Sequence, residues 1–260
     1  MGLIDANLLQ ALVGALGWTL VHFLWQGCAI AFAYWLICAF SKEQSAYLRY
    51  WSGLTAYFIS AACLLFTFKS YYRPPAEFSL EPIAAGPSNA FLVLSGNWPD
   101  IWPALHGGVE PVLPLLVVLW LIGVAWMSVR TFCDWVGTRR LLGSGTLDID
   151  DSLDAAVSRL SEQLGVSQTV RVIQSSVARV PMVVGFLRPV ILLPVSSIAG
   201  LPREQLEMVL AHELGHIKRF DFLFNLFQVL LETLLFFHPA IAWMGRRIRH
   251  EREMCCDDLV

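Results

Sequence analysis

The chain has 260 residues, of which 56% are apolar and only 15% are charged, with a formal net charge of −3. Of its 18 basic and 21 acidic residues, 11 lie in residues 1–130 and 28 in residues 131–260. A soluble domain carries about 25% charged residues throughout, so this split excludes one ordinary soluble domain. The absence of a basic surplus argues against a direct nucleic-acid partner, and six scattered cysteines predict reduced thiols.

Three apolar segments in the first half are long enough to cross a lipid bilayer. Residues 8–40 contain no Asp, Glu, Lys or Arg and exceed the length of one span. We therefore expect an interfacial helix near residues 4–16, followed by a span at about 18–40. A second span is predicted at 48–68 and a third at 112–131. These spans make residues 1–131 a predicted transmembrane module.

The charges that flank the spans predict an orientation. Lys42 and Arg49 follow the first span, and Arg130, Arg139 and Arg140 follow the third. The loop 69–111 is mainly acidic, holds seven of the 13 prolines and has no helical or strand period, so we expect it to be irregular and outside the cell. The positive-inside rule then places the N-terminus outside and residues 132–260 in the cytoplasm of a multi-pass inner-membrane protein.

His22 lies inside the first span, where an ionisable side chain is a functional candidate by default. The alternative is a neutral imidazole that is hydrogen-bonded to a neighbouring helix. We favour the second interpretation, because polar side chains commonly serve packing in helical membrane bundles.

Residues 132–260 have the pattern of a small α+β domain. Asp151 or Ser152 can cap a helix over 153–164, which Gly165 ends. Three short β-type runs follow, at residues 169–174, 180–187 and 189–193. Prolines in these runs predict edge strands, and an edge strand beside a catalytic helix can hold an extended peptide. We therefore expect a small sheet whose edge residues bind substrate: Val183, Val184 and Gly185.

A second amphipathic helix follows, and it carries the strongest chemical signal in the chain. Pro202 stands where a first helical residue should, and apolar residues recur at helical spacing: Leu206, Val209, Leu210, Leu214 and Ile217. The sequence HELGH on this helix is an HExxH motif. Residues four apart lie about 40° apart around a helix, so His212 and His216 can bind one zinc ion, with Glu213 as the general base. Incidental histidines on a surface helix are the alternative.

A third metal ligand is expected within residues 246–258. Glu253 could bind zinc, while Asp257, one turn later, supports an imidazole ligand. His250 and Glu251 are rival ligands, whereas Cys255 and Cys256 are better explained as buried structural thiols.

Residues 222–244 are apolar enough to suggest a fourth span, but polar residues and Pro239 interrupt them. If this segment crossed the bilayer, Glu253 would lie on the opposite side from His216. We therefore expect it to be re-entrant, to form a hairpin, or to lie buried in the domain or along the membrane interface.

Four further patterns accompany HExxH. They are the P-x(3)-G-x(3)-P-x-I-x-L-P run of 181–194, the continuation IKRFD at 217–221 with Asn225, the break FHP at 237–239, and REM-x-CD at 252–257. With these patterns, most of the chain resembles the integral-membrane zinc metallopeptidases of the beta-lactam sensor-transducer (BlaR/MecR) type, in the gluzincin clan. The resemblance implies one zinc ion per chain on His212, His216 and Glu253, with Glu213 as base. Asp221 and Asn225 match family positions, for which we expect only packing or support of a ligand.

The resemblance also implies a substrate class and partners. It implies a protein or peptide substrate, namely a cytosolic transcriptional repressor or the protein itself, and signal transduction at the lipid bilayer; a homodimer is a candidate assembly. Family members that sense antibiotics continue beyond the protease, so we expect a truncation after Val260 that leaves the activating signal and the oxyanion-stabilising residue unidentified. Two alternatives stay open: a housekeeping or prenyl-protein membrane protease, and a receptor whose zinc domain is a non-proteolytic relay. FHP and M-x-CD argue against the first, and Glu213 against the second.

Overall fold

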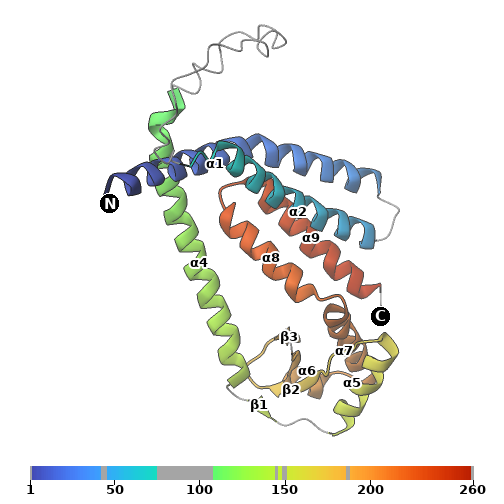
Figure 1. Ribbon diagram of the computed structural model, residues 1–260. Coiled ribbons are helices and arrows are strands. Elements are labelled where there is room, and N and C mark those ends of the chain that lie inside the picture. The colour runs from blue at the N-terminus through green and yellow to red at the C-terminus, as the bar shows by residue number, and fades with distance from the viewer. Residues whose placement is uncertain are drawn as a thin grey trace, which may run out of the picture. The chain divides into compact units, whose positions relative to one another are not determined.

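Figure 1 presents a computed structural model of the protein, which describes residues 2–41, 46–74, 108–143, 146–147, 151–185 and 188–258. Most of these residues are helical, and a small mixed sheet lies in the second half. This agrees with the predicted combination of a helical membrane module and an α+β domain. Most of the predicted irregular loop 69–111 lies outside the described residues.

Among the described residues, three helices are long and apolar enough to cross a membrane, as predicted. They are α1 (Gly2–Phe40), α2 (Ala46–Tyr71) and α4 (Leu113–Gly143), the last preceded by a short 3₁₀ turn, η1 (Glu110–Val112). The expected division of the first segment at about residue 17 is wrong, because α1 is one continuous helix. Its Gly14 and Gly17 each cost a helix only about 1 kcal/mol, and no proline interrupts it.

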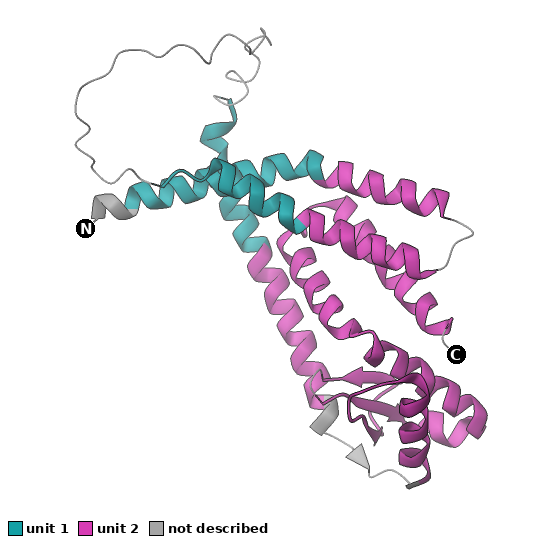
Figure 2. Ribbon diagram, turned by 45° about the vertical axis from the view of Figure 1, so that its right-hand side comes forward, with its two compact units in different colours: residues 1–26, 61–123 teal, residues 27–60, 124–260 magenta. Residues whose placement is uncertain are grey.

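The described chain forms two compact units, which Figure 2 distinguishes by colour. Unit 1 contains residues 1–26 and 61–123, and unit 2 contains 27–60 and 124–260. Within unit 1, Nε2 of His22 lies 2.7 Å from the hydroxyl of Tyr71 on the neighbouring helix α2. The hydrogen-bonded interpretation of His22 therefore agrees with its surroundings.

The sheet of unit 2 has the strand order β1-β2-β4-β3, with β2 and β4 parallel and both outer pairs antiparallel. Its strands are β1 (Thr146–Leu147), β2 (Arg171–Ser175), β3 (Met182–Val184) and β4 (Val190–Pro194). Each run expected to form a strand contains or overlaps one: β2 and β4 are shifted by one or two residues, and β3 covers only three of the eight residues expected. Strand β1 was not predicted. The predicted edge position is correct for β3, whereas β4 lies inside the sheet.

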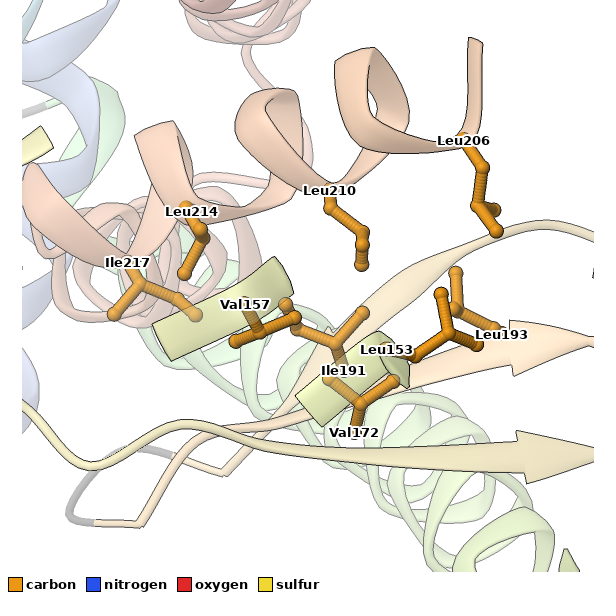
Figure 3. Close-up of a cluster of buried hydrophobic side chains, with 9 residues drawn as sticks. All are labelled: Leu153, Val157, Val172, Ile191, Leu193, Leu206, Leu210, Leu214 and Ile217. Carbon is orange, nitrogen blue, oxygen red and sulfur yellow. The ribbon is translucent and has the colours of Figure 1, made fainter. Parts of the chain in front are cut away.

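Two amphipathic helices and the sheet share one apolar core, drawn in Figure 3. Helix α5 (Asp151–Leu164) begins two residues earlier than predicted and ends as predicted, with Gly165 in a left-handed conformation after it (φ 69°). Helix α7 (Arg203–Lys218) carries the HExxH motif and follows a short helix, α6 (Val195–Gly200). Pro202 is the residue before α7 rather than its first residue. The core residues from these elements are Leu153, Val157, Val172, Ile191, Leu193, Leu206, Leu210, Leu214 and Ile217.

The apolar segment 222–244 forms a helical hairpin, one of the arrangements predicted for it. Helix α8 (Asp221–Leu234) and helix α9 (Pro239–Asp257) are joined by a turn that ends at the predicted FHP break. The part of α2 in unit 2 lies along this hairpin (Figure 1), with Phe58 stacked on Phe227 at 4.5 Å between ring centroids. The hairpin returns the chain, so that α9 reaches the motif helix.

Candidate metal centre

Helix α7 holds the motif by burying its opposite face. Leu210, Leu214 and Ile217 pack into the sheet core, so His212 and His216 are left on the side that faces α9. The two imidazole centroids are 5.0 Å apart and their rings are nearly perpendicular, at 81°. The spacing of four residues thus brings the rings together.

Helix α9 brings a carboxylate to the same point. Oε2 of Glu253 lies 3.6 Å from Nε2 of His212 and 3.4 Å from Nε2 of His216. Ligands at about 2.0–2.1 Å in a tetrahedral zinc site are about 3.3–3.4 Å apart. Both distances from Glu253 to an imidazole are therefore close to the spacing of ligands in a zinc site.

Each imidazole turns its other nitrogen toward an aspartate. Nδ1 of His212 lies 3.0 Å from Oδ1 of Asp257, and Nδ1 of His216 lies 2.7 Å from Oδ2 of Asp221. An ionised carboxylate only accepts hydrogen bonds, so these contacts place a ring proton on Nδ1, and a neutral imidazole in this orientation would present its Nε2 lone pair to a metal.

The rival ligands have other contacts. Glu251 is 1% exposed, and its carboxylate pairs with Arg49 of α2 at 2.8 Å and with Arg247 at 2.6 Å. His250 is solvent-exposed on α9. The alternatives left open by the sequence are therefore less well placed than Glu253.

Cys256 offers a second grouping, because ligand atoms of His212, His216 and Cys256 lie within 4.8 Å of one another. Its Sγ approaches His216 from the Nδ1 side, at 3.3 Å, where that nitrogen already contacts Asp221. The thiol also lies 3.1 Å from Nη2 of Arg219 and is fully buried. We favour the Glu253 set, because it leaves both Nδ1 contacts intact.

Glu213 is buried beside the imidazoles, and its burial raises the pKa of its carboxyl above the ordinary value. Burial also disfavours the imidazolium of His216, but hydrogen bonds to acceptors outweigh this and raise its pKa to about 11. The hydrogen bond from His216 lowers the pKa of Glu253 to about 2. In the metal-free state, positive charge is thus held between two carboxylates, Asp221 and Glu253.

A cavity of about 340 Å³ opens onto these groups. Its wall includes both histidines, Glu213 and Glu253, together with Val183 and Gly185 of the β3 region. Val184, the third residue predicted to bind substrate, is not among the residues that line this cavity. Gly185 has φ 94°, and a Cβ there would lie 2.9 Å from the carbonyl oxygen of Arg188, so the bend after β3 requires glycine.

A comparison with protein families identifies the chain. The family described as BlaR1 peptidase M56 matches residues 102–260, which is more than half of the sequence. The protein belongs to the BlaR1 peptidase M56 family. Membership implies a metallopeptidase, and the three long apolar helices agree with a multi-pass membrane protein.

Two curated relatives show how distant the similarity is. The chain is 28% identical to "Regulatory protein BlaR1" of Bacillus licheniformis over 139 residues, which cover 54% of this chain and 23% of that protein. It is 28% identical to "Methicillin resistance mecR1 protein" of Staphylococcus aureus (strain Mu50 / ATCC 700699) over 119 residues, which cover 43% of this chain and 20% of that protein. The matched part of this M56 chain thus spans about a fifth to a quarter of these relatives.

Several residues near the centre of this M56 protein were not singled out by their sequence. Arg219 lies 2.6 Å from Asp221 and donates to the carbonyl of Arg252, and Tyr50 of α2 donates to Asp221. Asn225, for which only packing or support was expected, accepts a hydrogen bond from Arg252 at the cavity wall. The KRFD and REM runs contain most of these residues, but Tyr50 has no comparable signal in its apolar span.

Proposed function

We propose that this protein is a membrane-anchored zinc endopeptidase of the signal-transducer type, which cleaves a cytosolic repressor or itself. The observation that carries this proposal is that Oε2 of Glu253 lies 3.4–3.6 Å from the Nε2 atoms of His212 and His216, beside a cavity that Glu213 also lines. Membership of the M56 family supports metal-dependent peptide hydrolysis.

His212, His216 and Glu253 would hold the zinc ion, one per chain. A bound zinc ion acts as a Lewis acid and lowers the pKa of a water molecule toward about 7. Glu213 would accept a proton from the attacking water and return it to the leaving amine. The raised pKa that burial gives this carboxyl group suits the first step, because a stronger base accepts the proton more readily.

Terminal strand β3 would hold the substrate. It pairs with β4 on one side only in the described sheet, and Val183 and Gly185 line the same cavity as the histidines. An extended peptide can add to such an edge through main-chain hydrogen bonds. A protein segment that can be drawn out into a strand is therefore the substrate class that this site favours.

The proposed setting is a cytoplasmic peptidase domain, residues 132–260, attached to a membrane module whose N-terminus is outside. The basic residues after the first and third candidate spans support this orientation. One relative carries the name "Regulatory protein BlaR1", which favours a signalling role over a housekeeping one.

The decisive test replaces Glu213 by Gln in the full chain. We expect zinc content to stay at about one per chain and proteolysis to fall by about 10²–10⁴-fold, the usual contribution of a general base. Glu207→Gln is the matched control, because Glu207 lies on the same helix and pairs with Arg159 at the surface. Zinc is measured by elemental analysis, and cleavage by mass spectrometry of cytosolic proteins in cells that express each variant.

Two outcomes would contradict the proposal. Metal-free wild-type protein after anaerobic purification would exclude the zinc site, and wild-type cleavage by the Glu213 variant would exclude the assigned base. A third result separates the alternatives: zinc binding by the wild-type protein, with no cleavage product that depends on it, would favour a non-proteolytic relay.

A further inference from the structure

Tyr50 on candidate membrane helix α2 is connected to the motif helix through one carboxylate. Its side chain is 1% exposed, and its hydroxyl donates to Oδ1 of Asp221 at 3.0 Å. The other oxygen of Asp221, Oδ2, lies 2.7 Å from Nδ1 of His216. Two hydrogen bonds therefore lead from α2 to an imidazole of the proposed metal site.

A buried cation completes the group around Asp221. Nη2 of Arg219 lies 2.6 Å from Oδ2 of Asp221 and 2.9 Å from the carbonyl oxygen of Arg252. The guanidinium carbon also lies over the ring of Tyr50, 5.3 Å from its centroid. Tyr50 thus contacts both the anion and the cation that surround Nδ1 of His216.

Helix α2 has other contacts that hold it on the hairpin. Arg49 pairs with buried Glu251 at 2.8 Å, and Tyr57 donates to the carbonyl oxygen of Ile241 at 2.9 Å. A Cβ at Gly53 would lie 2.6 Å from the Ile248 side chain, which shows how closely α2 and α9 approach. The hydroxyl of Tyr50 is therefore one of several contacts that retain the helix, but it is the one that reaches Asp221.

A carboxylate held by one hydrogen bond can rotate, whereas a carboxylate held at both oxygens has a defined plane. Tyr50 holds Oδ1 and so directs Oδ2 toward Nδ1 of His216, which sets the imidazole orientation and keeps its proton on Nδ1. We propose that Tyr50 is a positioning residue for His216, acting through Asp221, so that a membrane helix forms part of the metal centre. This inference rests on the proposed zinc site and extends it to α2.

The expected effect can be bounded. Loss of a partner that contacts a metal ligand typically weakens metal binding by about 10–100-fold. Tyr50 acts one hydrogen bond further away, so Tyr50→Phe should weaken zinc binding by about three- to tenfold. The phenylalanine keeps the ring, and with it the packing against Arg219.

The test measures zinc dissociation constants by chelator competition, using the full chain in detergent. Tyr57→Phe is the matched control. Tyr57 lies two turns along the same helix and is 0% exposed, and its hydroxyl is hydrogen-bonded to Glu232 and to the carbonyl oxygen of Ile241 instead of Asp221. We expect Tyr57→Phe to keep the wild-type affinity. The Co²⁺-substituted forms provide a second readout, since the visible spectrum should change for Tyr50→Phe only.

A double substitution tests the route through Asp221. Tyr50→Phe should add no further loss of zinc affinity in an Asp221→Asn background, because the two changes interrupt one chain of hydrogen bonds. Equal affinities of Tyr50→Phe and wild type, an equal loss in Tyr57→Phe, or full additivity with Asp221→Asn would each overturn the inference while leaving the zinc site intact. Wild-type protein that binds no zinc, or His212→Ala protein that binds it as tightly as wild type, would overturn both the site and the inference.

Discussion

The two halves of the proposed metal centre differ in how their imidazoles are supported. His212 is backed by Asp257 at 3.0 Å, whose side chain is 62% exposed near the end of α9. His216 is backed by Asp221 at 2.7 Å, whose side chain is 6% exposed and also contacts Arg219 and Tyr50. Water and salt weaken an exposed pair, whereas a buried pair keeps its strength and its geometry. The same aspartate–histidine contact should therefore serve mainly metal affinity at Asp257, but affinity and folding together at Asp221.

The largest effect is expected from Asp221→Ala. The substitution leaves the guanidinium of Arg219, whose side chain is 11% exposed, without its carboxylate, and an unpaired buried charge costs about 3–5 kcal/mol. It also removes the partner of Nδ1 of His216, which should weaken zinc binding by about 10–100-fold. Thermal unfolding in detergent and chelator competition would measure the two losses.

Asp221→Asn is the control that keeps the size and shape of the side chain but removes its charge. The amide can keep a hydrogen bond to Tyr50 but carries no charge for Arg219, so its stability should fall between those of wild type and the alanine variant. An alanine variant that unfolds at the wild-type temperature would show that this buried pair does not contribute to folding.

Asp257→Ala should have a smaller and simpler effect. Because the carboxylate is mostly exposed, we expect no measurable change in unfolding temperature. Zinc affinity should fall by about tenfold, the smallest loss that is typical when a residue hydrogen-bonded to a metal ligand is removed. Asp258→Ala, at the neighbouring exposed position, is the matched control. The difference between the two halves would disappear if Asp257→Ala destabilised the fold as much as Asp221→Ala.

Much of this arrangement can be predicted from the sequence, because it depends on patterns between residues that are close together in the chain. The apolar spacing in α7 and the glycine after α5 identify both helices, and the motif spacing predicts that His212 and His216 share a face. Glu253 was expected beside them from its own downstream pattern, and the structure brings it there.

The contacts of Asp221 were harder to anticipate. Its hydroxyl partner, Tyr50, is 171 residues away in the chain and lies in an apolar span where tyrosine usually indicates packing. No local period connects such a residue to a motif so far along the chain. The turn that places Asp221 was equally hidden, since Phe220 adopts φ 57° and ψ 35°, a conformation that glycine or asparagine would normally signal.

The smallest effect is expected from a change in this turn. The turn positions Asp221, whereas Asp257 is positioned by the regular helix α9. Phe220 is 48% exposed, so replacing its side chain removes little packing, and the backbone cost decides the result. Valine is disfavoured in the left-handed region and asparagine is tolerated, so Phe220→Val should be less stable than Phe220→Asn by about 1 kcal/mol. In a domain of this size that difference is about 2–4 °C in unfolding temperature. Zinc affinity should fall in parallel for the valine variant, because a strained turn shifts Asp221 away from His216. If the two variants unfold at the same temperature, the left-handed turn is not what holds the buried half of the centre in place.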